Sequence, residues 1–213
     1  MKIKVCGITN ADQLKHLEEL GIDYAGMIYY NKSSRYVSDK LSSEAVKKLN
    51  LSIQKVGVFV NASEKDILTQ IELYELNAVQ LHGDETPLFC KCISNHVNVI
   101  KAFRINGNRQ NIDRLVNPFE EYCDNYLLDT GGTGRYGGSG EKFDWNILQD
   151  NKINKPFFLS GGISPQDVVK IQAFIHPFFH AVDINSRFET SPGIKNMDQV
   201  KIFVEHLKGI TSN

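Results

Sequence analysis

Short hydrophobic runs recur along the chain at intervals of roughly 20 to 30 residues, and the segments between most of them place apolar residues at helical spacing. Most of these runs contain β-branched or aromatic residues, which favour extended strands. We expect eight strands, at residues 2–6, 24–29, 54–60, 78–81, 97–103, 125–129, 156–160 and 180–184.

Helix boundaries can be read in several of the segments between these strands. Thr9 followed by Asp12 is typical of a capping box at a helix start, and Gly21 is suited to end that helix. Ser63 with Asp66 repeats the same device before the fourth strand. The pattern therefore predicts strands and helices in regular alternation.

Alternating strands and helices form a parallel sheet with right-handed crossovers. Eight such units predict an α/β fold, a single (β/α)8 TIM barrel, at the small end of the usual size range. An open doubly wound sheet is the alternative, but the first strand is not followed by a dinucleotide-binding Gly-x-Gly-x-x-Gly motif. No linker or low-complexity segment divides the sequence, so we expect one catalytic domain, residues 1–213.

Composition and charge argue against several classes of binding partner. The 213 residues are 41% hydrophobic with a formal net charge of -1, which gives no electrostatic reason to expect nucleic acid or an anionic membrane. No apolar run approaches the roughly 20 residues that span a bilayer, and the N-terminal segment lacks a signal-peptide pattern. Cysteines at 6, 90, 92 and 123 show no zinc spacing. We expect a cytoplasmic protein with no metal and no nucleic-acid or membrane partner.

In a barrel of this kind the active site lies at the carboxyl ends of the strands. The polar residues and glycines expected there are Cys6, Arg35, His82, Arg104, Asp129, Gly161, Gly162, Asp183, Asn185 and Ser186. The double glycine precedes a helix start signalled by Ser164, Pro165 and Asp167. It either makes a tight turn or binds an anion with free N–H groups. Because strands seven and eight commonly form a phosphate site in this fold, the second reading is favoured.

The other candidates each have a functional and a structural interpretation. Cys6 is either a base or nucleophile, or a small buried hydrophobic residue. Asp129, which follows two leucines, is either an acid with a pKa raised by burial or a turn cap. Arg35 could clamp a carboxylate with its fork or lie in solvent, and His82 could orient a substrate or satisfy a strand end.

Two further features concern the loops. Asp183 is a candidate for substrate binding, although Asp183 and Glu189 are also suited to hold the last loop in place. The glycine-rich segment 131–140 follows the sixth strand and is expected to be a flap over the mouth of the barrel. It lacks the order of a phosphate-binding Walker A loop.

Several segments together resemble one family along nearly the whole chain. They are residues 4–9, 34–38, 56–61, 79–85, 127–130, 137–140 with 143–145, 159–163 and 186–195. The order Cys-Gly-Ile-Thr from Cys6, Gln-Leu-His-Gly from Gln80 and then Asp129 is the specific part. On these residues the sequence resembles the phosphoribosylanthranilate isomerases of tryptophan biosynthesis.

The resemblance implies roles for particular residues. The family's general base falls on Cys6, its general acid on Asp129, and the arginine that holds the anthranilate carboxylate on Arg35. The phosphate ligands fall on Gly161, Gly162, Asn185 and Ser186. Two positions depart from the family pattern. Arg187 replaces a glycine and Ser139 replaces a threonine, and the first departure weakens the assignment of the ligands after strand eight.

The implied reaction is an Amadori rearrangement of N-(5-phosphoribosyl)anthranilate to 1-(2-carboxyphenylamino)-1-deoxyribulose 5-phosphate. An acid and a base on opposite sides of the sugar suffice, so no cofactor is expected and the partner is a small phosphoribosyl substrate. The sequence leaves open a monomer or a homodimer. Two other readings are another phosphosugar isomerase, such as that of histidine biosynthesis, and a non-catalytic phosphometabolite-binding barrel. The first is generally read as using two aspartates, so Cys6 argues against it.

Overall fold

Eight parallel strands close into a barrel. The computed structural model describes residues 1–106, 110–130, 144–149 and 151–209. The strands are β1 (Lys2–Cys6), β2 (Tyr24–Ile28), β3 (Gln54–Phe59), β4 (Ala78–Leu81), β5 (Asn98–Ile105), β6 (Asn125–Thr130), β7 (Phe157–Leu159) and β8 (Phe179–Ile184). Each pairs in parallel with the next, and β8 pairs with β1. The predicted (β/α)8 barrel is thus confirmed.

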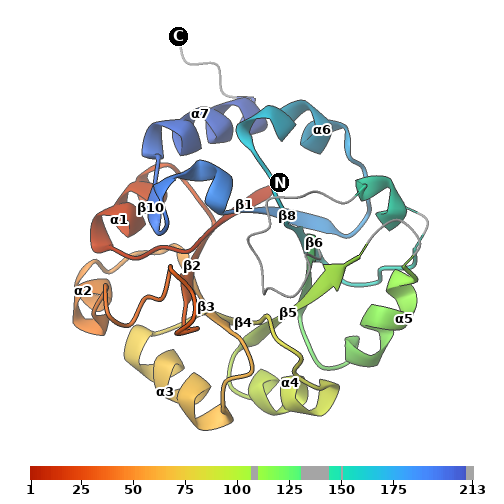
Figure 1. The fold of residues 1–213 in the computed structure, drawn as a ribbon, viewed down its shortest axis with the longest axis horizontal. Coiled ribbons are helices and arrows are strands. Elements are labelled where there is room, and N and C mark those ends of the chain that lie inside the picture. Colours follow the sequence, from red (N-terminus) through yellow and green to blue (C-terminus); the bar gives the residue numbers. More distant parts are fainter. Residues whose placement is uncertain (107–109, 131–143, 150, 210–213) are drawn as a thin grey trace.

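Helices surround the barrel as an outer ring (Figure 1). They are α1 (Ala11–Glu19), α2 (Ser43–Lys48), α3 (Glu64–Tyr74), α4 (Pro87–Ser94), α5 (Ile112–Val116), α6 (Val168–Ala173) and α7 (Met197–Lys208). Short 3₁₀ turns lie at Asn117–Phe119, Trp145–Leu148, Pro165–Asp167 and Ser186–Phe188. A small hairpin of β9 (Glu189–Ser191) and β10 (Ile194–Lys195) follows β8 and was not predicted.

The predicted helix starts were right at two places and wrong at one. Ser63 caps α3 by accepting a hydrogen bond from the Asp66 N–H. Ser164 and Asp167 form a capping box, although the turn that it opens is a 3₁₀ turn. The cap of α1 is Asn10 and not Thr9, because the Thr9 hydroxyl donates to the Gly193 carbonyl at 2.7 Å. A contact distant in sequence therefore displaced the cap by one residue.

Two apolar regions make the core. The larger one packs the outer faces of the strands against the helices, with fully buried residues such as Leu14, Leu17 and Phe203. The smaller one fills the barrel interior and consists of Val56, Ala78, Ile100, Ala102, Leu127, Phe158 and Ala181, with Tyr24 packed against it.

A layer of polar side chains lies directly above this interior cluster. Side chains alternate along a strand, so residues two positions further along point the same way. Two positions beyond Ala78, Leu127, Phe158 and Ala181 the chain has Gln80, Asp129, Ser160 and Asp183. The apolar interior therefore passes into a layer of polar side chains at the carboxyl ends of the strands.

Two expectations concern parts of the molecule outside this core. Within the described residues, no helix has the length and apolar character needed to cross a bilayer. The expected flap at 131–140 lies outside the described residues. The same is true of two residues of the family motif, Ser139 and Phe143.

Candidate active site

One pocket at the carboxyl ends of the strands is bordered by nine of the ten residues that the sequence placed there, all except Arg104. Its lining comprises Cys6, Ile28, Tyr30, Ser33, Arg35, Val58, Val60, Gln80, His82, Asp129, Ser160, Gly161, Gly162, Ile163, Asp183, Asn185 and Ser186. The pocket holds about 850 Å³ of empty space when the open solvent at its mouth is included.

Cys6 ends β1 and Asp129 is on β6, so two strands, β7 and β8, separate them around the barrel. Both side chains are buried, with relative exposures of 4% and 6%. Burial raises the pKa of the Cys6 thiol and outweighs the opposing effects of Lys4 and Lys195. The thiol is therefore protonated at neutral pH, and its thiolate form needs additional stabilisation.

His82 lies between Gln80 and Asp129. Its Nδ1 is 2.6 Å from Nε2 of Gln80, and its Nε2 is 3.4 Å from Oδ2 of Asp129. The second contact has the length of an ion pair but not the geometry of a hydrogen bond, and Nε2 has no hydrogen-bond partner among the described residues. The ring therefore faces the Asp129 carboxyl group, and Gln80 fixes the ring from the other side.

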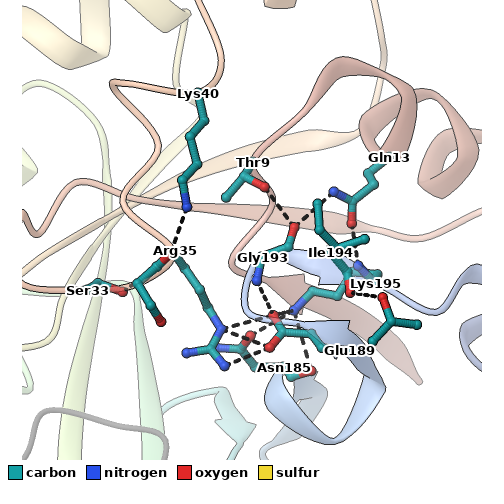
Figure 2. A network of polar contacts seen from close by, with 12 residues as sticks. Thr9, Gln13, Ser33, Arg35, Lys40, Asn185, Glu189, Gly193, Ile194 and Lys195 are labelled. Atoms are coloured by element: carbon teal, nitrogen blue, oxygen red, sulfur yellow. Dashed lines mark hydrogen bonds and ion pairs between the residues drawn. The ribbon is translucent and has the colours of Figure 1, made fainter.

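A network of charges connects Arg35 to the last loop (Figure 2). Glu189 accepts from Nε of Arg35 at 2.9 Å, from Nη2 at 2.6 Å and from Nζ of Lys195 at 2.6 Å. Lys195 also donates to Oδ1 of Asn185 at 2.7 Å, and the Gly193 N–H donates to Glu189 at 3.1 Å. The predicted loop-holding role of Glu189 thus agrees with its contacts.

The same contacts restrict what Arg35 can do. Its hydrogen bonds with Glu189 raise the pKa of the guanidinium, which is only 17% exposed. Two of its three nitrogens are bound, while Nη1 makes no hydrogen bond to any described residue. Arg35 is therefore a fixed cation with one free edge on the pocket, and not a mobile side chain in solvent.

The double glycine presents free donors to the pocket. The N–H groups of Gly161 and Gly162 form no hydrogen bond with a described residue. Both residues have positive φ, at 95° and 65°, so the tight-turn reading and the anion-binding reading are compatible. Asn185 and Ser186, which follow β8, line the same part of the pocket wall as candidate ligands.

Below the pocket, Asp183 accepts from Nζ of Lys4 at 2.8 Å and from the Ser160 hydroxyl at 3.3 Å. Lys4 has no exposed surface and Asp183 is 6% exposed. Asp183 therefore borders the pocket but its side chain is already engaged by a buried lysine.

Two arginines that the sequence analysis singled out do not line the pocket. Arg104, which was expected at the mouth, pairs with Asp84 at 3.0 Å beside a separate surface cavity. Arg187, which departs from the family pattern, is exposed and does not line the pocket.

Sequence reasoning missed Lys4, Lys195 and Gln80. A signal existed for Lys4 and Gln80, because each lies two residues before a predicted site residue on its strand and so shares that residue's face. Lys195 had no local signal, since its position depends on the hairpin of β9 and β10.

Comparison with known proteins identifies the family of the chain. Residues 3–206 match the family model described as "N-(5'phosphoribosyl)anthranilate (PRA) isomerase". An N-(5'-phosphoribosyl)anthranilate isomerase of Parabacteroides distasonis is 38% identical over 209 residues, covering 97% of this chain and 93% of the relative.

Solved structures give the same result. A phosphoribosyl anthranilate isomerase of Thermotoga maritima is 34% identical with a TM-score of 0.82, covering 98% of this chain and 99% of the other. A phosphoribosyl anthranilate isomerase in complex with reduced 1-(o-carboxyphenylamino)-1-deoxyribulose 5-phosphate is 33% identical, with a TM-score of 0.79 and coverage of 98% and 99%. The chain therefore belongs to the N-(5'-phosphoribosyl)anthranilate isomerase family.

Proposed function

We propose that Cys6 is the general base and Asp129 the general acid of the phosphoribosylanthranilate isomerase reaction in this chain. The chain is an isomerase of tryptophan biosynthesis by its family. The observation that carries the residue roles is the placement of both side chains on one pocket from non-adjacent strands. A sugar between them would meet the thiol on one side and the carboxyl group on the other.

The chemistry needs two proton transfers. Asp129 donates a proton to the ring oxygen of the ribose, and the sugar opens to an iminium. Cys6 as thiolate takes the proton from C2, which gives an enolamine that tautomerises to the ketone. Positioned acid and base groups contribute roughly 10²- to 10⁴-fold each, and holding both ends of the substrate supplies much of the rest.

His82 supports the acid in this proposal. Its Nε2 is 3.4 Å from Asp129, so the ring is placed to orient the carboxyl group and not only the substrate. Gln80, at 2.6 Å from the other ring nitrogen, holds the ring in that position.

The phosphate is assigned to the loops after β7 and β8. The free N–H groups of Gly161 and Gly162 support this, because bare backbone donors bind phosphate oxygens. Asn185 and Ser186 complete the candidate ligand set.

The anthranilate end is assigned to the wall formed by β2 and β3. Arg35 offers the free edge of its fork to the carboxylate, and Ile28, Val58 and Val60 give an apolar surface for the ring. Asp183 contributes to substrate binding indirectly, because it holds the side chains of Lys4 and Ser160 in place below the pocket.

The surroundings of the reaction are also part of the proposal. The chain acts as a single catalytic domain, residues 1–213, in the cytoplasm on a small phosphoribosyl substrate. One solved relative, from Thermotoga maritima, is described as dimeric with monomers derived from it. For this chain either a monomer or a homodimer is proposed.

Steady-state kinetics of Cys6→Ala and Asp129→Asn test the residue roles. Each change is expected to lower kcat by about two orders of magnitude or more with little change in KM, because it removes a group that acts only in the transition state. The disappearance of anthranilate-type fluorescence reports turnover. Near-normal kcat in either folded variant removes that residue from the chemistry.

A further inference from the structure

A lysine lies in the barrel interior below the proposed base. Lys4 and Cys6 are two positions apart on β1, so their side chains point to the same side of the strand. Lys4 has no exposed surface, and the barrel interior around this level is otherwise filled by the apolar cluster that includes Leu127 and Phe158. An ammonium group at such a place loses its hydration, which costs several kcal/mol unless it is paired.

The ammonium group of Lys4 is held by one carboxylate. Nζ donates to Oδ1 of Asp183 at 2.8 Å, and the two residues are register partners on β1 and β8. The other oxygen of Asp183 accepts from the Ser160 hydroxyl at 3.3 Å. Lys4 is thus held on the face of β1 that also carries the Cys6 thiol, two positions before it.

A buried pair of this kind is weak support for stability. Two apolar side chains of similar volume usually stabilise a core as well or better. The position of the Lys4–Asp183 pair directly under the pocket therefore calls for a functional explanation.

Four charged groups act on the Cys6 thiol. Lys4 from β1, Lys195 from β10 and Arg35 from the loop after β2 are positive, and Asp183 from β8 is negative. Lys195 and Arg35 both share Glu189, which offsets their charge. Among these charged neighbours, Lys4 does most to lower the pKa of the thiol, against the larger effect of burial.

We propose that Lys4 is a positioning residue that stabilises the thiolate of Cys6 while Asp183 holds the lysine in place. The inference rests on the proposed role of Cys6 as the base. The thiolate takes up the C2 proton and becomes a neutral thiol, and Lys4 keeps its own proton throughout. The positive charge of Lys4 thus stabilises the thiolate form of Cys6, which burial of the site disfavours.

Alkylation of Cys6 by iodoacetamide measures this effect without substrate, because the thiolate is the reacting form. The rate is followed against pH and read by mass spectrometry of the peptide that contains Cys6. For Lys4→Met we expect the midpoint of the profile to rise by about one pH unit or more and the rate near neutral pH to fall about tenfold or more.

A second buried lysine provides the matched control. Lys101 is 3% exposed and pairs with Glu85 at 2.9 Å, but it lies between Ile100 and Ala102, which face the interior, and so points out of the barrel. Lys101→Met also leaves a buried carboxylate unpaired, so it should lower Tm as Lys4→Met does. We expect its Cys6 alkylation profile to match that of the unchanged protein.

A double variant covers the case in which Lys4→Met does not fold. Lys4→Met with Asp183→Asn removes both charges and leaves no unpaired charge, and its alkylation midpoint should lie between those of the unchanged protein and of Lys4→Met. A folded Lys4→Met or double variant with an unshifted profile would overturn the inference. Because this readout needs no turnover, it is independent of the kinetics of Cys6→Ala, which test the role of the base itself.

Discussion

At the scale of single residues, Gly26 leaves room for the Cys6 thiol because glycine has no side chain. Gly26 is the register partner of Cys6 on the neighbouring strand β2. A Cβ added there would lie 2.9 Å from Sγ of Cys6 and 3.1 Å from its Cα, which is closer than real Cβ atoms normally approach. The thiol therefore occupies space that only glycine leaves free.

Gly26→Ala should consequently displace the thiol. We expect kcat to fall about tenfold or more, because a shift of about 1 Å in a reacting group can cost up to 10²-fold. The measurement is kcat together with Tm, so that loss of fold is seen separately.

Gly57→Ala on β3 is the control for that change. A Cβ at Gly57 would meet Leu76 at 2.6 Å and Phe59 at 2.7 Å, and neither of these lines the pocket. This variant should lose stability and keep its turnover. Equal kcat in Gly26→Ala and the unchanged protein would show that the thiol position is not set by Gly26.

The residues that could be predicted are those whose place in a strand decides their environment. Cys6 and Asp129 close their strands, so barrel topology alone brings them to the mouth. Arg104 satisfies the same rule, since it shares the face of β5 that carries Ile100 and Ala102, but it pairs with Asp84 and does not line the pocket. Lys4 escaped notice because a lysine within a strand usually indicates a solvated face.

At the scale of elements, the hairpin of β9 and β10 anchors the last loop to the first helix. The carbonyl of Gly193 accepts from the Thr9 hydroxyl at 2.7 Å and from Nε2 of Gln13 at 3.0 Å. The next strand carries Lys195, whose N–H donates to the Gln13 side chain at 2.7 Å. Through Glu189 this anchor fixes Arg35 at the wall of the pocket.

Gly193→Ala should release that anchor. Gly193 has a φ of +87°, and a Cβ there would lie 2.8 Å from Cγ2 of Thr9. We expect KM to rise several-fold more than kcat falls, because Arg35 is proposed to bind substrate and not to react. Steady-state kinetics with the isomerase substrate provide the measurement.

Gly209→Ala is the matched control for backbone strain. Gly209 has a φ of +68°, but a Cβ there meets no heavy atom within 4 Å. This variant carries a similar strain without displacing the hairpin, so it should lose stability with KM unchanged. An equal rise of KM in both variants, or in neither, would refute the anchoring role.

The eight strands were predictable and the hairpin was not predicted, for a physical reason. The strands stand out in the sequence as short segments rich in apolar and β-branched residues, and the predicted bounds of β1 and β4 matched at both ends. The hairpin strands are three and two residues long and are held by side-chain contacts to α1 and Arg35. Pro192 before Gly193 was the local turn signal that could have indicated it.

At the scale of the whole molecule, the closed barrel brings together residues from both ends of the chain. Lys4 and Asp183 are 179 positions apart and form a direct pair, since β1 and β8 are neighbours. The sequence predicted this closure from the count of strand and helix units. It could not predict which charges would pair inside, because that depends on register and side-chain reach.

The family match also bears on the two rival readings. The match to the isomerase family over residues 3–206 supports phosphoribosylanthranilate isomerase, and it argues against a non-catalytic barrel and against a different phosphosugar isomerase. The central claim is therefore geometric. We propose that one sugar lies between Cys6 and Asp129, with its phosphate at the double glycine after β7.

A crystal structure of this chain with the reduced product analogue bound tests that claim most directly. We predict the Cys6 thiol and the Asp129 carboxyl group within about 4 Å of the sugar chain on opposite sides. We also predict phosphate oxygens within about 3.2 Å of the N–H groups of Gly161 or Gly162. A phosphate bound elsewhere, or a sugar that meets both groups on one side, would contradict the account.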